Sequence, residues 1–134
     1  YPMVASFMEN TKEFAKVNGY VQTVFGRKLW LPEINSPNGQ RRQASERAAI
    51  NAPMQGTAAD LIKMAMINVQ KTILKNSFST KMILQVHDEL IFETPLKEVE
   101  EFRDCLKLVM CSVAKLNVPL EVDIGCGDNW EQAH

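Results

Sequence analysis

Residues 81–94 read KMILQVHDELIFET, and this stretch decides the fold class. It contains two short β-forming runs, 81–86 and 90–94, with three ionisable side chains between them. Short apolar runs bounded by a turn signal are typical of neighbouring β-strands. We therefore predict an antiparallel hairpin whose tight turn is formed by residues 87–89.

A long helical pattern precedes this hairpin, from Gln40 to about Lys75. Pro53 must kink or split the helix, because proline lacks an amide hydrogen and its ring crowds the preceding turn. Residues 57–60, TAAD, fit an N-terminal capping pattern. We therefore predict that a second helix begins at Thr57.

The outer parts of the sequence predict further short elements. Residues 4–15 place apolar side chains at helical spacing, and Asn18-Gly19 is a typical helix stop. The other expected elements are a hairpin over 20–31 turning at 25–27, a polar loop over 32–39, an amphipathic helix over 99–116, and a strand over 120–124 before a short polar tail. This order of helices and hairpins indicates an α+β fold.

The overall charge conceals a strong asymmetry. The 134 residues carry a formal net charge of −1 and 46% apolar side chains, as expected for one ordinary globular domain. Residues 1–87 have a balance of +6, whereas residues 88–134 have a balance of −7. The near-neutral total argues against a nucleic-acid partner, but the separate basic part indicates an anionic partner for one face.

The cysteines and the lack of targeting signals favour a cytoplasmic protein. Three cysteines without a CxxC pair argue against a disulfide framework or a structural zinc site, and they indicate a reducing compartment. No apolar run has the length of a membrane span, and no signal-peptide pattern is present. The stretch 125–127, GCG, lacks the spacing of a phosphate-binding loop and predicts a turn. His134 is either a site residue or an untethered tail.

The tip of the hairpin over 81–94 is a candidate metal site. Mg²⁺ prefers oxygen ligands, commonly one or two carboxylates together with phosphates and water. Asp88 and Glu89 provide such carboxylates at a rigid turn, although turns also favour acidic residues because these solvate well. A two-metal site needs further ligands that span both ions. Candidates by residue type alone are Asp60, Asp123 and Asp128.

Three polar side chains share one face of the long helix if the helix is continuous. Arg47, Asn51 and Gln55 are spaced four residues apart. Such donors suit the acceptors of the DNA minor groove, which occupy similar places in every base pair. A solvated helix face explains the same pattern. The surrounding basic cluster, a candidate for phosphate contacts, comprises Arg27, Lys28, Arg41, Arg42 and Arg47.

Several stretches of the sequence resemble the bacterial family A DNA polymerases. They are NAPMQGTAAD (51–60), QVHDEL (85–90), GR (26–27) with LPEI (31–34), and NWEQAH (129–134). The resemblance is highly specific, because it covers essentially the whole chain with its motifs in the family's order. It implies a C-terminal portion of such a polymerase, with the base of the fingers in residues 1–40 and a palm segment in residues 41–134.

The resemblance implies roles for the candidate residues. Asp88 would be a catalytic metal ligand with Glu89 in support, and His87 would lie near the primer terminus. The residues expected to touch the minor groove of the primer–template are Arg47, Asn51 and Gln55. The implied reaction is attack of a primer 3′-hydroxyl on the α-phosphate of a dNTP, with release of pyrophosphate and two Mg²⁺ ions as cofactor.

The resemblance also implies that essential parts lie elsewhere in the polymerase. The second metal-binding Asp, the triphosphate-binding Lys and Arg, and the thumb all precede the region that this chain matches. We therefore expect the remaining fingers, palm and thumb to be partners of the chain, and the isolated chain to be inactive. Leu29 and Trp30 stand where many family members carry Arg and Tyr, a departure confined to the surface of one hairpin.

Two other classes of function stay open from the residues alone. The first is a non-catalytic duplex DNA-binding module that uses the same basic helix. The second is a metal-dependent hydrolase with Asp88 and Glu89 as ligands, which leaves the polar row of the long helix unexplained.

Overall fold

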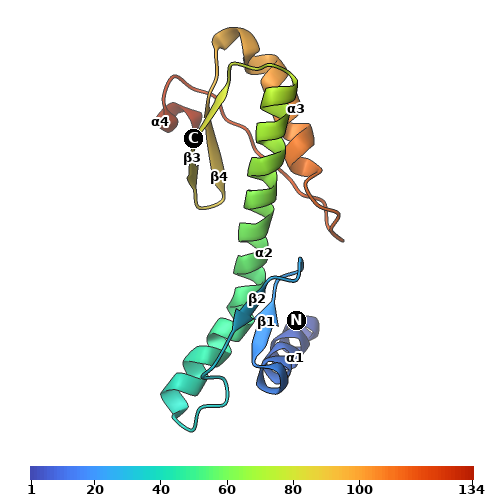
Figure 1. The fold of residues 1–134 in the computed structure, drawn as a ribbon, viewed down its shortest axis with the longest axis vertical. Coiled ribbons are helices and arrows are strands. Elements are labelled where there is room, and N and C mark those ends of the chain that lie inside the picture. The colour runs from blue at the N-terminus through green and yellow to red at the C-terminus, as the bar shows by residue number, and fades with distance from the viewer. The chain divides into compact units, whose positions relative to one another are not determined.

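The computed structural model describes residues 1–134 and has mixed helical and antiparallel β structure (Figure 1). The chain divides into two compact units, residues 1–60 and 61–134. Its elements are α1 (Pro2–Asn18), β1 (Tyr20–Gln22), β2 (Lys28–Trp30), α2 (Gly39–Lys75), β3 (Lys81–Val86), β4 (Glu89–Glu93), the 3₁₀ helix η1 (Leu96–Glu98), α3 (Val99–Cys111) and α4 (Trp130–Ala133). None of the helices combines the length and the apolar character that crossing a membrane requires.

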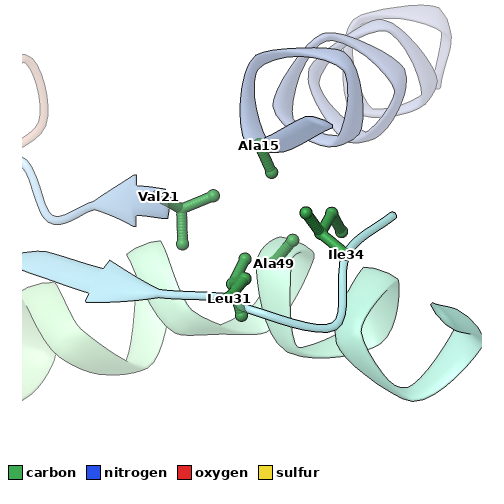
Figure 2. Close-up of a cluster of buried hydrophobic side chains, with 5 residues drawn as sticks. All are labelled: Ala15, Val21, Leu31, Ile34 and Ala49. Atoms are coloured by element: carbon green, nitrogen blue, oxygen red, sulfur yellow. The ribbon is translucent and has the colours of Figure 1, made fainter. Parts of the chain in front are cut away.

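The first unit is built around the β1–β2 hairpin. Helix α1 ends at Gly19, whose φ of 79° lies in the left-handed region and whose N–H bonds back to Ala15. The strands then pair from Tyr20 opposite Trp30 to Gln22 opposite Lys28, which confirms the predicted helix stop and hairpin. The buried side chains that join the hairpin and the following loop to α1 and α2 are Ala15, Val21, Leu31, Ile34 and Ala49 (Figure 2).

The prediction of a second helix beginning at Thr57 is wrong. Helix α2 runs without interruption from Gly39 to Lys75, with Pro53 inside it. A capping side chain must accept from a free N–H of a new first turn. The Thr57 hydroxyl instead donates to the carbonyl of Pro53 and accepts from the Val24 N–H at 3.0 Å. The residue that resembles a cap is therefore an anchor between the helix interior and the β1–β2 turn.

The second unit is built around the β3–β4 hairpin, which confirms the expected pair of strands. The register runs from Lys81 opposite Glu93 to Val86 opposite Glu89, with an irregularity between Met82 and Leu84. The core of this unit contains Val69, Ile73, Phe102 and Leu106. Phe102 meets the rings of Phe78 and Phe92 edge-on at centroid distances of 5.4 and 5.1 Å, so α3 holds β4 through aromatic packing.

The base of the β3–β4 hairpin is held by a carboxylate. Both oxygens of Glu98, at the end of η1, accept from the Ser79 N–H at 2.9 and 3.0 Å. The Thr80 hydroxyl donates to the same carboxylate at 3.1 Å. These hydrogen bonds, the Ser79 N–H foremost, lower the pKa of Glu98 below its ordinary value of 4.5.

Two expectations for the C-terminal part of the chain are wrong. Residues 120–124 pair with neither strand of the hairpin, and the sheet of this unit has two strands. Their alternation of half-buried and exposed side chains comes from packing: Ile124 lies against the core of the second unit without a strand partner. Helix α3 ends at Cys111 rather than at residue 116, and the polar tail contains the short helix α4.

Candidate active site and nucleic-acid interface

The β3–β4 hairpin presents Asp88 at its tip. His87 and Asp88 alone form the turn, since Glu89 already pairs with Val86 as the first residue of β4. His87 has a φ of 53°, and its carbonyl accepts from the Gln85 side-chain amide at 2.6 Å. The carboxylate of Asp88 is exposed and makes no hydrogen bond or ion pair. It is therefore free to bind an external cation or donor.

Glu89 lies beside Asp88 in the chain but in different surroundings. Its Oε1 lies 3.0 Å from Nε2 of His134, the last residue. The Glu89 side chain is 44% exposed and that of His134 is 53% exposed. The three-residue turn predicted over 87–89 is thus a two-residue turn followed by a carboxylate that is held by the C-terminal segment.

The donor chemistry of the hairpin tip fits Mg²⁺, but the tip is not a complete metal site. Asp88 and Glu89 offer the carboxylate oxygens that Mg²⁺ prefers. No group of three or more His, Cys, Asp or Glu side chains in the chain could hold a metal ion. Asp123 and Asp128 thus form no such cluster with the tip, and Asp60 belongs to the first unit, where it binds Arg27 at 2.7 Å. Further ligands would have to come from outside these residues.

The polar row of α2 consists of Arg47, Asn51 and Gln55, all in the first unit. Because α2 is unbroken through Pro53, the spacing of four residues places the three on one side of the helix. All three are exposed, and their side chains make no hydrogen bond or ion pair within the chain. A row of unengaged donors on a continuous helix can bind a series of acceptors on a ligand.

The two arginines at the start of α2 are engaged, unlike this polar row. Arg42 is half-buried, and its Nη1 donates to the Ser36 carbonyl at 3.1 Å. Arg41 is exposed and lies 3.9 Å from Glu33 in a long ion pair, which contributes little in water. Arg41 thus keeps its charge available at the surface, whereas one edge of Arg42 is already occupied.

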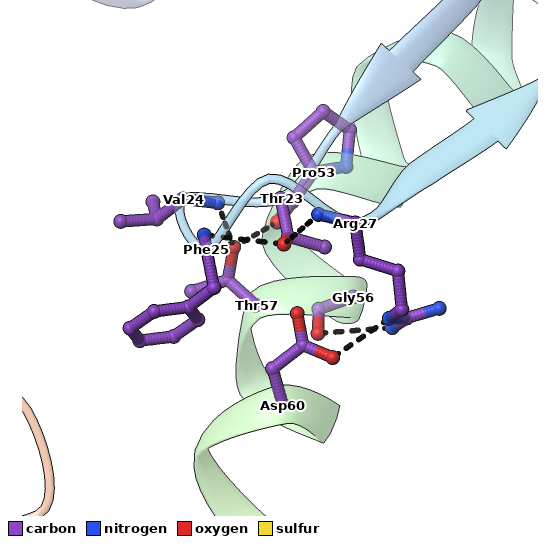
Figure 3. A network of polar contacts seen from close by, with 8 residues as sticks. All are labelled: Thr23, Val24, Phe25, Arg27, Pro53, Gly56, Thr57 and Asp60. Carbon is purple, nitrogen blue, oxygen red and sulfur yellow. Dashed lines mark hydrogen bonds and ion pairs between the residues drawn. The ribbon is translucent and has the colours of Figure 1, made fainter.

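A polar clamp fixes the β1–β2 turn on α2, and the sequence reasoning missed it. Arg27 donates from Nε to Asp60 at 2.7 Å and from Nη2 to the Gly56 carbonyl at 3.2 Å (Figure 3). The Thr23 hydroxyl accepts from the N–H groups of Phe25 and Arg27, both at 3.2 Å. Arg27 is therefore part of the scaffold rather than a free member of the basic cluster.

The clamp borders a hollow that includes Gln55. The hollow has a volume of about 260 Å³ and is lined by residues of β1, β2, the turn between these strands, and α2. Its polar or charged lining residues are Gln22, Thr23, Arg27, Lys28 and Gln55. The conformation of the β1–β2 turn thus shapes the surroundings of one residue of the polar row.

Comparison with known proteins identifies the family. The profile of DNA polymerase family A matches residues 1–132. The chain is 48% identical over 134 residues to DNA polymerase I of Pseudomonas aeruginosa, covering 100% of this chain and 15% of that protein. It is 47% identical over 133 residues to DNA polymerase I of Chloroflexus aurantiacus, covering 98% of this chain and 14% of that protein.

A solved structure gives the same result. The POL domain of Pol1 from M. smegmatis, in complex with DNA primer-template and dNTP, matches with a TM-score of 0.92 and 45% identity. The match covers 94% of this chain and 22% of that one. These findings confirm the α+β fold class and the resemblance drawn from the motifs, with a chain that spans about 15% of the length of its curated relatives. The chain belongs to DNA polymerase family A.

Proposed function

We propose that this chain is the C-terminal palm portion of a bacterial DNA polymerase I, which adds dNTPs to a primer 3′-hydroxyl as directed by a template. The observation that carries the proposal is the free carboxylate of Asp88 at the tip of the β3–β4 hairpin, in a chain whose family match covers residues 1–132. Relatives over the whole chain are named DNA polymerase I, and the matching POL domain is in complex with primer-template and dNTP. DNA replication and repair are the processes that such an enzyme serves.

In this proposal the hairpin tip carries the chemistry. Asp88 is a metal ligand, Glu89 supports it as a second catalytic carboxylate, and His87 lies near the primer terminus. Two bound Mg²⁺ ions supply charge stabilisation for the attacking and leaving oxygens of the phosphoryl transfer. The support from this chain is its donor chemistry: an unengaged carboxylate beside one that is already oriented.

The polar row of α2 is the proposed duplex contact. Arg47, Asn51 and Gln55 offer free donors along one rigid helix, which suits the minor-groove acceptors that every base pair presents. Such contacts test for correct pairing without reading sequence. The phosphates of the same duplex are the proposed partners of Arg41 and Arg42, of which Arg41 has the more available guanidinium.

The rest of the polymerase completes the site in this proposal. Residues 1–40 form the base of the fingers and residues 41–134 a palm segment, while the remaining fingers, palm and thumb supply the other metal carboxylate and the triphosphate-binding side chains. The isolated chain is then inactive, because its one metal-binding carboxylate, Asp88, cannot hold both ions. The proposed location is the bacterial cytoplasm, at the nucleoid.

The test is primer extension by a complete polymerase that contains this segment, with Asp88→Ala as the variant. We expect loss of nucleotide addition with little change in primer–template affinity, since the contacts of the polar row remain. Asp104→Ala is the matched control, because Asp104 is an exposed acidic residue of α3 whose side chain makes no hydrogen bond or ion pair. Primer extension by the Asp88→Ala polymerase at nearly the unmodified rate would refute the role of Asp88.

A second measurement tests whether residues outside this chain are needed for catalysis. The purified 134-residue chain is mixed with primer–template, dNTPs and Mg²⁺, and extension is followed on a gel. No product is expected from the chain alone. Extension by the isolated chain would refute the proposal that residues outside it complete the site.

A further inference from the structure

The last ten residues form a built segment rather than a loose tail. Asn129 caps α4 by accepting from the Gln132 N–H at 2.9 Å, and the Gln132 side chain accepts from the Asp128 N–H at 3.0 Å. These reciprocal hydrogen bonds satisfy donors at the start of the short helix. The turn from residue 128 to residue 132 is therefore fixed locally.

Two glycines let the backbone of α4 approach residues 125–127 closely. A Cβ at Gly125 would lie 1.9 Å from the carbonyl oxygen of Ala133. A Cβ at Gly127 would lie 2.5 Å from Cβ of Gln132 and 2.7 Å from the backbone nitrogen of Ala133. Since these contacts involve backbone atoms, a larger residue at either position must displace α4. Residues 125–127, GCG, thus form the backbone surface against which α4 packs.

His134 follows this helix and is held on several sides. Its Nε2 lies 3.0 Å from Oε1 of Glu89, and its Nδ1 lies 3.4 Å from the carbonyl oxygen of Trp130. The imidazole also lies against the Trp130 indole, with ring centroids 5.7 Å apart. Both ring nitrogens lie near oxygen acceptors, and an N–H at Nε2 donates to Glu89.

We propose that His134 is a positioning residue that orients Glu89 beside the free carboxylate of Asp88. This inference rests on the proposed function and deepens it. A glutamate side chain at a partly exposed site has several rotamers, and a hydrogen bond from a fixed donor restricts them. Gly125 and Gly127 position α4, α4 positions His134, and His134 contacts Glu89. Asp88 has no such partner and stays available to ligands.

The kinetic test uses single-turnover addition of one dNTP by the complete polymerase at saturating primer–template. His134→Ala should lower the rate at least about 10-fold, as expected when the partner that orients a metal-site residue is lost. His134→Gln keeps an N–H donor and should recover part of the rate. Glu131→Ala is the matched control and should leave the rate unchanged, because Glu131 is an exposed residue of the same helix whose side chain makes no hydrogen bond or ion pair.

Gly127→Ala tests the packing of α4 on Gly125 and Gly127 separately from the imidazole. It should lower the rate as His134→Ala does, because the added Cβ displaces α4 from the two glycines. In a Glu89→Gln background, His134→Ala should cause little additional loss, because the two residues act through one contact. Independent, multiplicative losses from the two substitutions would overturn the proposed coupling.

A spectroscopic test needs neither metal nor activity. The chain has two histidines, so the ring resonances of His134 in the 134-residue chain are assigned by comparison with His87→Gln. Glu89→Gln should shift the His134 ring resonances, whereas Glu93→Gln should not. Unchanged His134 resonances in Glu89→Gln would overturn the contact itself.

The outcomes distinguish the inference from the proposed function. If Asp88→Ala abolishes addition and His134→Ala is as fast as the unmodified polymerase, the positioning role fails and the proposed function stands. If Asp88→Ala is fully active, the proposed function fails. If His134→Ala weakens primer–template affinity but not the rate at saturation, His134 contacts DNA directly and the positioning role is refuted.

Discussion

Substitution of Gly56 by alanine tests how closely the β1–β2 turn packs on α2. Gly56 lies in the helix interior, where alanine normally stabilises by about 1 kcal/mol because glycine loses more backbone entropy on folding. Here, however, an added Cβ would lie 2.7 Å from Cγ2 of Thr23 and 3.3 Å from Nη2 of Arg27. Thr23 is 8% exposed, so its methyl group has little room to move.

The clash should outweigh the gain in helix propensity. Forcing an extra carbon into a packed contact costs about 1–3 kcal/mol. Displacing the turn also weakens the bond from Arg27 to the Gly56 carbonyl, which contributes about 1 kcal/mol at such a part-exposed site. After subtraction of the propensity gain, Gly56→Ala should lower the free energy of unfolding by about 1–3 kcal/mol.

The assay is urea denaturation of the 134-residue chain, followed by circular dichroism. Gly39→Ala is the matched control in the same helix, because an added Cβ there meets nothing closer than Arg42 at 3.9 Å, and it should be neutral or slightly stabilising. Thr23→Ser removes the obstructing methyl group and keeps the hydroxyl that accepts from Phe25 and Arg27. The double variant Thr23→Ser/Gly56→Ala should therefore recover at least about 1 kcal/mol relative to the sum of the single variants. Stabilisation by Gly56→Ala equal to that by Gly39→Ala would refute the close packing.

Three further predictions concern DNA affinity, pH and the second core. Arg47→Ala should weaken duplex binding by the complete polymerase for all sequences, because the minor-groove acceptors that it is proposed to contact occur in every base pair. Fluorescence anisotropy measures this affinity, and an unchanged affinity contradicts the interface. Glu98→Gln should lower the Tm of the 134-residue chain at neutral pH but not well below pH 4. A carboxylate with a lowered pKa stabilises the fold above its unfolded pKa of 4.5, and this contribution is lost as the pH falls through the pKa of the folded state. An equal Tm difference at both pH values contradicts this prediction. Phe102→Ala should lower the free energy of unfolding by about 3–5 kcal/mol in urea denaturation, since the residue is 4% exposed and its ring packs against two other aromatic rings. A loss below about 1 kcal/mol contradicts the described core.

Local patterns predicted the elements that depend on local chemistry. The stop at Asn18-Gly19, the two hairpins and the polar loop before α2 are all present, because turn residues and short β-forming runs determine them within a few residues. The helix break expected at Pro53 is wrong, because tertiary context overrides local preference at this position. Helix α2 continues through Pro53, and the Thr57 hydroxyl one turn later bonds to the Pro53 carbonyl and to the Val24 N–H of the distant β1–β2 turn, a tertiary contact that no local pattern reports.

In the candidate site, too, local patterns predict some of the residues and miss the contacts between distant segments. Asp88 is recognisable from its place between two apolar runs, and the row of Arg47, Asn51 and Gln55 from its helical spacing. The contact of His134 with Glu89 joins segments that lie far apart in the sequence, as does the bond from Arg27 to Asp60 over 33 residues. Such pairs depend on tertiary packing, and a single sequence contains no periodic signal for them.

The most direct test of the central claim is the single-turnover rate at which a complete polymerase carrying Asp88→Asn adds one dNTP to a saturating primer–template. Asparagine keeps the size of the side chain at the hairpin tip and removes its charge. The proposed metal-ligand role predicts a loss of at least about 1,000-fold, since charge stabilisation by bound metal is worth several kcal/mol in the transition state. A rate within about 10-fold of the unmodified polymerase, with the same primer–template affinity, would contradict the claim that Asp88 carries the chemistry.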